Sequence, residues 1–210
     1  MTIYVVIMAI AVAVTIAGEF SQIWAMRAAG KLVAATTFVV AAVALGVPSR
    51  SPHGAAILAA MVLSWIGDVA LLSDHKKVFL VGLGSFLLAH VAFAVAFLSL
   101  GPMPLGVGLA LVMLSPALFL VLRWIGPKAG KLTVPVRLYM VAITAMVALS
   151  VGIVGTNMGP VWVLAAHLFF FSDLFVARQR FISPTPYNRL IGLPPYFAAQ
   201  LLFVYAAANT

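Results

Sequence analysis

Residues 78–99 read VFLVGLGSFLLAHVAFAVAFLS, an apolar run that contains one histidine and no charged side chain. A helix of about 20 apolar residues is long enough to cross the hydrocarbon core of a bilayer. Similar runs recur along the chain, which is 65% hydrophobic and 8% charged, whereas soluble domains are roughly 45–50% apolar and about 25% charged. The sequence therefore predicts an all-α, multi-pass membrane protein.

The apolar runs predict an eight-helix transmembrane bundle that forms a single integral membrane domain over residues 1–210. The expected ranges are 2–22, 32–48, 54–73, 78–99, 104–124, 136–155, 160–179 and 192–208. The first run lacks a basic flank and a small-residue cleavage site, so it is expected to remain a membrane helix. Because the chain has no cysteine, it has no disulfide, thiol nucleophile or thiolate metal site.

The basic residues predict the orientation of this bundle. Eleven of the twelve Lys and Arg residues follow the first, third, fifth and seventh predicted helices, and Arg50 alone falls on the other side. Because basic loops stay in the cytoplasm, both termini are expected to be extracytoplasmic, in a bacterial plasma (inner) membrane. The net charge of +8 is spread over four short loops, so it does not indicate nucleic-acid binding.

The two halves of the chain, about 1–100 and 101–210, resemble each other. Residues 82–93 read GLGSFLLAHVAF and residues 192–203 read GLPPYFAAQLLF, and each run follows a helix with a small residue and then aspartate. The order is the same in both halves, and four helices is an even number. We therefore expect a parallel 4+4 repeat, with chance recurrence of Gly, Ala and Leu as the alternative.

Two of the four acidic residues lie inside predicted membrane helices. Asp68 occurs in LSWIGDVALL, residues 63–72, and Asp173 in HLFFFSDLFV, residues 167–176. A carboxylate in hydrocarbon costs about 2.5–3.5 kcal/mol on insertion scales, so such groups face a polar cavity or a partner. Glu19 lies near the inner end of the first helix, and Asp74 is expected in a solvated turn.

These positions predict one polar site in the inner half of the bundle. Asp68 and Asp173 occupy equivalent places in the repeat, so both are expected to reach a shared cavity. The other candidates are Glu19, Ser64, His90, Tyr139 and Gln200. Structural roles remain open, because each aspartate could pair with a basic loop residue and the others could bond between or within helices. Two carboxyl groups in a low-dielectric pocket suit general acid–base hydrolysis.

The order of several motifs resembles the YhhN-like family of multi-pass membrane proteins, the lysoplasmalogenases. The motifs are Lys31, SWIGDVALL at 64–72, FLVGLGSFLLAHVAF at 79–93, PVRLY at 135–139, FSD at 171–173, and Tyr196 with Gln200. The resemblance implies an eight-span hydrolase without a metal cofactor. It also implies cleavage of the vinyl ether bond of lysoplasmalogens to a fatty aldehyde and glycerophosphoethanolamine or glycerophosphocholine.

The resemblance places Asp68 and Asp173 on the family's aspartate motifs and His90 on its histidine in the fourth helix. One aspartate would be the acid and the other the base and cation stabiliser, by the logic used on glycosidic bonds, and the sequence does not say which. His90 would orient water or tune a carboxyl group. Lys31, expected in the loop after the first helix, would hold the substrate phosphate with a loop arginine. Glu19, Ser64, Tyr139 and Gln200 complete the expected substrate-binding set.

Two departures affect the expected substrate contacts: Leu32 stands where the family usually has proline, and Phe197 where a second tyrosine is common.

Three other classes stay open on the sequence. A zinc-dependent membrane lipid hydrolase could use Asp68, His90, His167 and Asp173 as ligands, although no spacing is a metal motif. A transporter would also explain buried acids in a duplicated bundle, and Pro194-Pro195 hints at an interrupted helix. A non-catalytic membrane scaffold is the third. The expected partners are a lysophospholipid substrate and membrane lipids, with no nucleic acid, and the oligomeric state is unknown.

Overall fold

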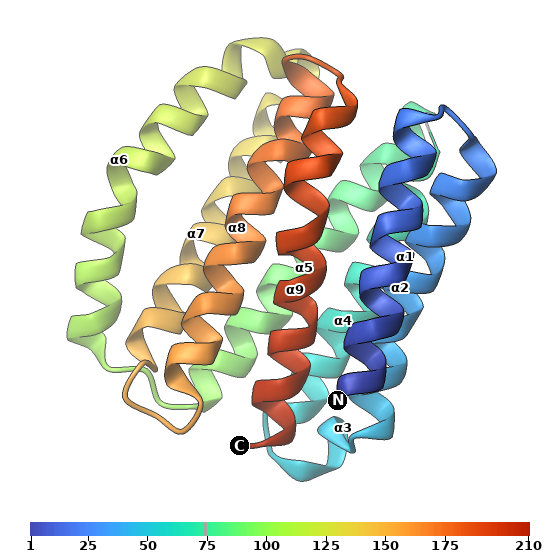
Figure 1. The fold of residues 1–210 in the computed structure, drawn as a ribbon. Coiled ribbons are helices and arrows are strands. Elements are labelled where there is room, and N and C mark those ends of the chain that lie inside the picture. The colour runs from blue at the N-terminus through green and yellow to red at the C-terminus, as the bar shows by residue number, and fades with distance from the viewer. Residues whose placement is uncertain (74) are drawn as a thin grey trace.

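The computed structural model of the protein describes residues 1–73 and 75–210, without the side chain of Arg50. The described chain is helical and forms one bundle (Figure 1). Its helices are α1 (Thr2–Phe20), α2 (Trp24–Ala44), α3 (Val47–Arg50), α4 (Gly54–Ala70), α5 (Lys76–Ser99), α6 (Pro104–Ala129), η1 (Gly130–Leu132), α7 (Thr133–Gly152), α8 (Gly159–Phe181) and α9 (Pro186–Ala208). The expectations for Asp74 and for the Arg50 side chain lie outside the described residues.

Each of the eight predicted ranges overlaps one long helix, and the largest boundary error is at α2. The segment before residue 32 was expected to be a loop because it carries Arg27 and Lys31, and that expectation is wrong. Helix α2 begins at Trp24, so both basic residues lie on it. A long basic side chain can bury its stem and carry its charge away from the helix axis, so a basic residue does not mark a helix end.

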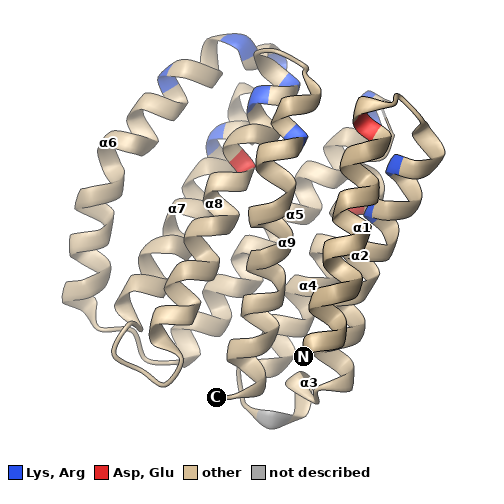
Figure 2. Ribbon diagram, in the orientation of Figure 1, with Lys and Arg blue, Asp and Glu red and all other residues tan. Residues whose placement is uncertain are grey.

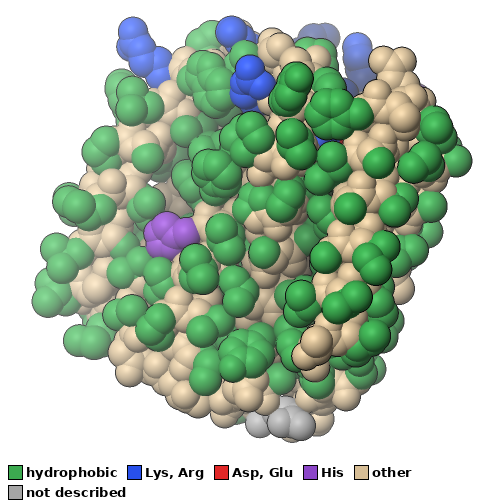
Figure 3. Space-filling model, in the orientation of Figure 1, with side chains coloured by type: hydrophobic (Ala, Val, Ile, Leu, Met, Phe, Trp, Pro, Cys, Tyr) green, Lys and Arg blue, Asp and Glu red, His purple; other side chains and the backbone are tan. Residues whose placement is uncertain are grey.

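Six segments of the described chain are long and apolar enough to cross a membrane. One of them, Pro104–Gly152, includes both α6 and α7, and α4 is a shorter apolar helix of 17 residues. Apolar side chains are spread over the face of the bundle shown in Figure 3. Exposed large apolar residues of the chain include Leu105 and Met113, which are 70% and 74% exposed. A soluble protein does not present such a surface to water, so the fold is that of an integral membrane protein.

The helices pack as antiparallel neighbours in sequence: α1 with α2, α4 with α5, α6 with α7, and α8 with α9. Contacts of α5 with α7, and of α2 and α4 with α9, join the first four long helices to the last four. Helix α6 is the outermost, and in the described chain it packs only on α7, α8 and η1 (Figure 1). The centre is therefore enclosed by α2, α4, α5, α7, α8 and α9.

The two ends of the bundle differ in charge. The described Lys and Arg residues gather at one end, and both chain termini lie toward the other (Figure 2). Between the ends, buried aromatic rings fill the interior. The Phe93 and Phe203 ring centroids are 4.2 Å apart and those of Phe97 and Trp162 are 5.6 Å apart. All four side chains are fully buried, so the core beneath the charged end is solid.

Gly30 allows α1 and α2 to approach closely near the charged end. A Cβ atom at this position would lie 2.5 Å from Oγ1 of Thr15 and 2.7 Å from the carbonyl oxygen of Ala11. We expect Gly30→Ala to lower the free energy of unfolding by about 1–3 kcal/mol, because overpacking forces the backbones apart. Thermal unfolding in detergent measures this change.

The matched control is Gly84→Ala on α5, where an added Cβ atom meets nothing within 4 Å. This substitution should leave the stability unchanged or raise it slightly, because alanine restricts the unfolded chain. Equal losses in the two variants would contradict the close packing of α1 and α2.

Candidate active site

A cavity of about 350 Å³ opens in the inner part of the bundle, toward the charged end. Both buried aspartates line it, Asp68 from α4 and Asp173 from α8. The polar side chains beside the two carboxyl groups include Lys31 on α2, Tyr139 on α7 and Tyr196 on α9. Most of the remaining lining is apolar, as is usual for pockets that bind organic ligands. We refer to this space as the carboxylate cavity.

Asp68 is held by two donors. Its Oδ1 lies 3.2 Å from Nζ of Lys31, and its Oδ2 accepts a hydrogen bond of 2.6 Å from the hydroxyl of Tyr196. The side chains of Asp68 and Lys31 are each only 4% exposed. Lys31 therefore does not lie in a solvated loop, because it forms a buried ion pair that joins α2 to α4.

Asp173 has different neighbours. Its Oδ2 accepts a hydrogen bond of 2.6 Å from the hydroxyl of Tyr139 and lies 3.5 Å from Nε2 of His90. His90 is fully buried, and the centroid of its ring lies 4.6 Å from that of Phe169, with the two planes tilted by 50°. It does not line the carboxylate cavity, so it lies on the side of Asp173 that faces away from the cavity.

The local sequence explains how the two aspartates reach one space. Gly67 precedes Asp68, and a Cβ atom there would lie 2.6 Å from the ring of Phe86, so the glycine lets α4 pack closely on α5. Gly192 plays the same part between α9 and α8, where an added Cβ would lie 2.8 Å from Cβ of Phe175. Close helix packing at small residues is common in membrane bundles, and it brings both carboxyl groups to the centre.

The mouth of the carboxylate cavity is basic. Arg180 and Arg189 are among its lining residues, and the guanidinium of Arg180 lies 4.1 Å from the ring centroid of Phe79. Nε of Arg189 lies 2.8 Å from Oε1 of Glu19, which is also 3.4 Å from Nε of Arg27. The rim thus combines positive charge with an apolar interior, a suitable pattern for an anionic amphiphile.

Four predicted site residues do not line the carboxylate cavity, and His90, behind Asp173, is one of them. Glu19 lies on a second, more open hollow of about 380 Å³, together with Arg27. Ser64 and Gln200 are fully buried away from the cavity wall. Ser64 lies four residues before Asp68, so the two lie on one face of α4. At Asp68 this face meets the cavity, whereas at Ser64 it packs in the core.

Tyr196 is the site residue that the sequence reasoning missed. It is one of the motif residues that carry the family resemblance, but it is not among the candidate site residues predicted from the sequence. The structure shows that its hydroxyl donates to Asp68, while the ring of Phe86 packs 5.9 Å from the Tyr196 ring. The useful signal was the hydroxyl itself, because a buried phenol usually needs a hydrogen-bond acceptor.

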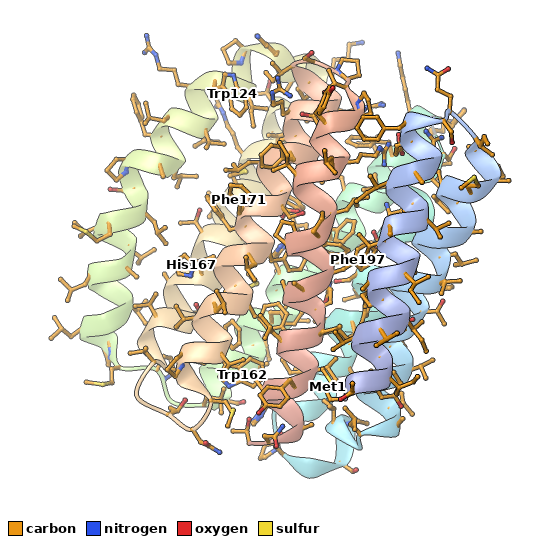
Figure 4. The ribbon with its side chains drawn as sticks, viewed as in Figure 1. Met1, Trp124, Trp162, His167, Phe171 and Phe197 are labelled. Carbon is orange, nitrogen blue, oxygen red and sulfur yellow. The ribbon has the colours of Figure 1, made fainter. Side chains whose placement is uncertain are left out.

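The four residues of the zinc alternative do not converge. Within residues 1–73 and 75–210, no three His, Cys, Asp or Glu side chains lie together as a possible metal site. His167 is exposed, with Nδ1 2.8 Å from the carbonyl oxygen of Val163, and it lies on the α6 side of α8 (Figure 4). It is therefore separate from His90 and the two aspartates.

The fold and site define a helical membrane protein with two buried carboxyl groups in one cavity. The chain belongs to the YhhN family, whose model matches residues 26–207. It is 31% identical to the lysoplasmalogenase TMEM86A of Bos taurus, over 79% of this chain and 70% of the relative. It is 33% identical to a lysoplasmalogenase of Mycobacterium tuberculosis, over 70% of this chain and 58% of the relative. No solved structure matches the chain.

The Lys31–Asp68 ion pair predicts a pattern of stability changes. Lys31→Met and Asp68→Asn should each lower the free energy of unfolding by about 3–5 kcal/mol, because each leaves one buried charge without its partner. The double variant should recover most of this loss, since it buries no charge at this place. Thermal or denaturant unfolding in detergent measures the stabilities of the two single variants and the double variant. If the loss in the double variant equals the sum of the two single losses, the ion pair is contradicted.

Proposed function

We propose that the protein is a lysoplasmalogenase that cleaves the vinyl ether bond of a lysoplasmalogen. The products are a fatty aldehyde and glycerophosphoethanolamine or glycerophosphocholine. The observation that carries the proposal is the carboxyl pair of Asp68 and Asp173 in one cavity, in a family whose matched relatives are lysoplasmalogenases. The proposed reaction uses side chains of this chain and requires no metal cofactor.

Vinyl ether hydrolysis needs an acid, an anion and a base for water. A proton is delivered to the alkenyl carbon distal to oxygen, which produces an oxocarbenium ion. Water then adds to the carbon next to oxygen, and the resulting hemiacetal collapses to an aldehyde and an alcohol. Two carboxyl groups at one site supply these functions in glycosidases, which pass through the same type of cation. Asp68 and Asp173 are proposed for these roles, and His90 orients Asp173.

The cavity also fits the shape of a lysolipid. Arg180 and Arg189 at the mouth suit the phosphate, because guanidinium groups bind phosphate oxygens through paired hydrogen bonds. The apolar wall beyond them suits an alkenyl chain. A volume of about 350 Å³ is near the lower end for ligand pockets, so we propose one chain rather than two, with the substrate entering from the leaflet at the charged end. In this arrangement Lys31 holds Asp68 and the rim arginines take the phosphate.

We further propose that the protein is one integral membrane domain with eight spans, placed in a bacterial plasma membrane with both termini outside the cytoplasm. The gathering of basic residues at one end (Figure 2) supports the orientation, because basic segments stay on the cytoplasmic side. Helix α4 is short for a span, and local thinning of the bilayer or tilt of its neighbours accommodates such a helix.

The partners of the two aspartates support a 4+4 repeat. Each aspartate meets a residue of the second long helix of its own half and a residue of the fourth long helix of the other half. These partners are Lys31 and Tyr196 for Asp68, and Tyr139 and His90 for Asp173. The helices that supply the partners correspond between the two halves, as expected for a parallel repeat.

Features of the structure favour a hydrolase over a transporter. The two prolines that hinted at an interrupted helix, Pro194 and Pro195, lie inside α9, which runs unbroken from Pro186 to Ala208. The aromatic core beneath the cavity is filled by Phe93, Phe203 and their neighbours. A substrate in the carboxylate cavity therefore has an apolar floor beneath it, which suits a reaction followed by return to the same leaflet.

We predict that the purified protein releases a fatty aldehyde from a 1-alkenyl lysophospholipid. Asp68→Asn and Asp173→Asn should each reduce turnover by at least about 10²-fold, the low end for losing a general acid or base, and His90→Ala should have a smaller effect. Mass spectrometry of products from a panel of lysolipids measures this activity. Release of fatty acid from 1-acyl lysolipids, with the vinyl ether left intact, would overturn the assignment.

Two controls make this test specific. The saturated 1-alkyl analogue should bind without reacting, because it has no alkene to protonate. His167→Ala should retain activity, because His167 is exposed and separate from the cavity, whereas a zinc site that used His167 would be lost.

We predict that a phosphatase fused after Thr210, which is active only outside the cytoplasm, will be active in cells. A cytoplasm-specific reporter at the same position should be inactive. The opposite pattern would reverse the orientation and place the carboxylate cavity in the outer leaflet.

A further inference from the structure

The two carboxyl groups differ in their surroundings, and this difference separates their roles. We infer that Asp173 is the neutral acid that delivers the proton, and that Asp68 is the anion that stabilises the oxocarbenium ion and accepts a proton from water. This assignment rests on the proposed function, which by itself treats the two aspartates alike.

The contacts of Asp68 are those of a carboxylate. Its two oxygens accept from the Lys31 ammonium at 3.2 Å and from the Tyr196 hydroxyl at 2.6 Å. A lysine ammonium has three donors and no acceptor, so it matches an ionised partner. While Asp173 is neutral, protonation of Asp68 would leave the buried ammonium with no carboxylate in the cavity, which is strongly unfavourable in a low-dielectric interior.

The contacts of Asp173 are those of a group without a fixed cation. In the described part of the chain, the side chains found against it are the phenol of Tyr139 and the imidazole of His90. Both approach Oδ2, so Oδ1 is the oxygen that no described hydrogen bond engages. The Asp173 side chain is 7% exposed and lines the cavity. With Oδ2 as acceptor, the acidic proton resides on Oδ1, where a bound alkene can take it.

The assignment yields a balanced reaction. The alkene π pair forms a C–H bond with the Asp173 proton, which leaves Asp173 ionised and the ether oxygen in an oxocarbenium ion beside Asp68. Water adds to the cationic carbon and gives a proton to Asp68. The hemiacetal then collapses: Asp68 returns that proton to the leaving glycerol oxygen, and Asp173 takes the hemiacetal hydroxyl proton. Both aspartates regain their starting states.

Infrared spectroscopy tests the resting protonation directly. The chain has only four acidic residues, so the carbonyl stretch of a neutral carboxylic acid is readily assigned by substitution. Wild-type protein at neutral pH should show this band, with a shift in heavy water. Asp173→Asn should remove it and Asp68→Asn should retain it. Loss of the band in Asp68→Asn, or retention in both variants, would overturn the inference.

A cationic ligand tests the location of the anion. The probe is a 1-alkylamino-1-deoxy lysophospholipid, whose protonated amine mimics the oxocarbenium ion, and the neutral reference is the 1-alkyl ether. Calorimetry in detergent gives the ratio of their dissociation constants without requiring activity. Asp173→Asn should keep the wild-type preference for the amine. Asp68→Asn should reduce this preference, measured as the ratio of the two dissociation constants, by at least about tenfold. The reverse pattern, or equal loss in both, contradicts the assignment.

These outcomes can be distinguished from a variant that does not fold and from failure of the proposed function. If Asp68→Asn does not fold, the Lys31→Met/Asp68→Asn double variant replaces it, because that protein buries neither charge at this place. If wild-type protein releases no aldehyde, the proposed function fails whatever the spectra show. If it releases aldehyde and the neutral carboxyl band belongs to Asp68, the proposed function stands and only this assignment fails.

Discussion

The buried ion pair between Lys31 and Asp68 is the interaction on which the site depends. Charges in the interior of a membrane protein are costly unless they are paired, and this pair joins α2 to α4 at a separation of 3.2 Å. The pair explains why Lys31 is only 3% exposed and why a carboxylate, that of Asp68, lies near the end of the short helix α4. Because each charge requires the other, the relative positions of α2 and α4 are held at the cavity wall.

Around this pair the molecule places chemically similar groups in unequal settings. Two aspartates each accept a 2.6 Å hydrogen bond from a tyrosine, yet the cation stands beside only Asp68 and an imidazole stands beside Asp173. Enzymes that use two carboxyl groups as acid and base depend on such a difference in environment. The lysine of α2 beside Asp68 and the phenol of α7 beside Asp173 are contacts in which the two halves differ.

The packing of the bundle determines where a substrate can be. The aromatic rings of Phe93, Phe97, Trp162 and Phe203 fill the interior toward the termini, so the cavity opens only toward the charged end in the described chain. There the arginines of α8 and α9 meet an apolar wall. A lysolipid matches this gradient, because its phosphate and its chain lie on either side of the bond to be cleaved.

The sequence by itself determined the helical class and the place of each long helix, because apolar runs with sparse charge have few other solutions in a bilayer. It also singled out Asp68 and Asp173, since an isolated carboxylate in an apolar run requires a reason. It misplaced Lys31, because a basic residue near a helix start has the same local pattern whether its ammonium points to water or to a buried anion. Only the tertiary structure decided that pairing, together with the hydroxyl of Tyr196 on Asp68 and the exclusion of Ser64 and Gln200 from the cavity wall. These depend on how six helices rotate and pack against one another, which is set by contacts between residues far apart in the chain.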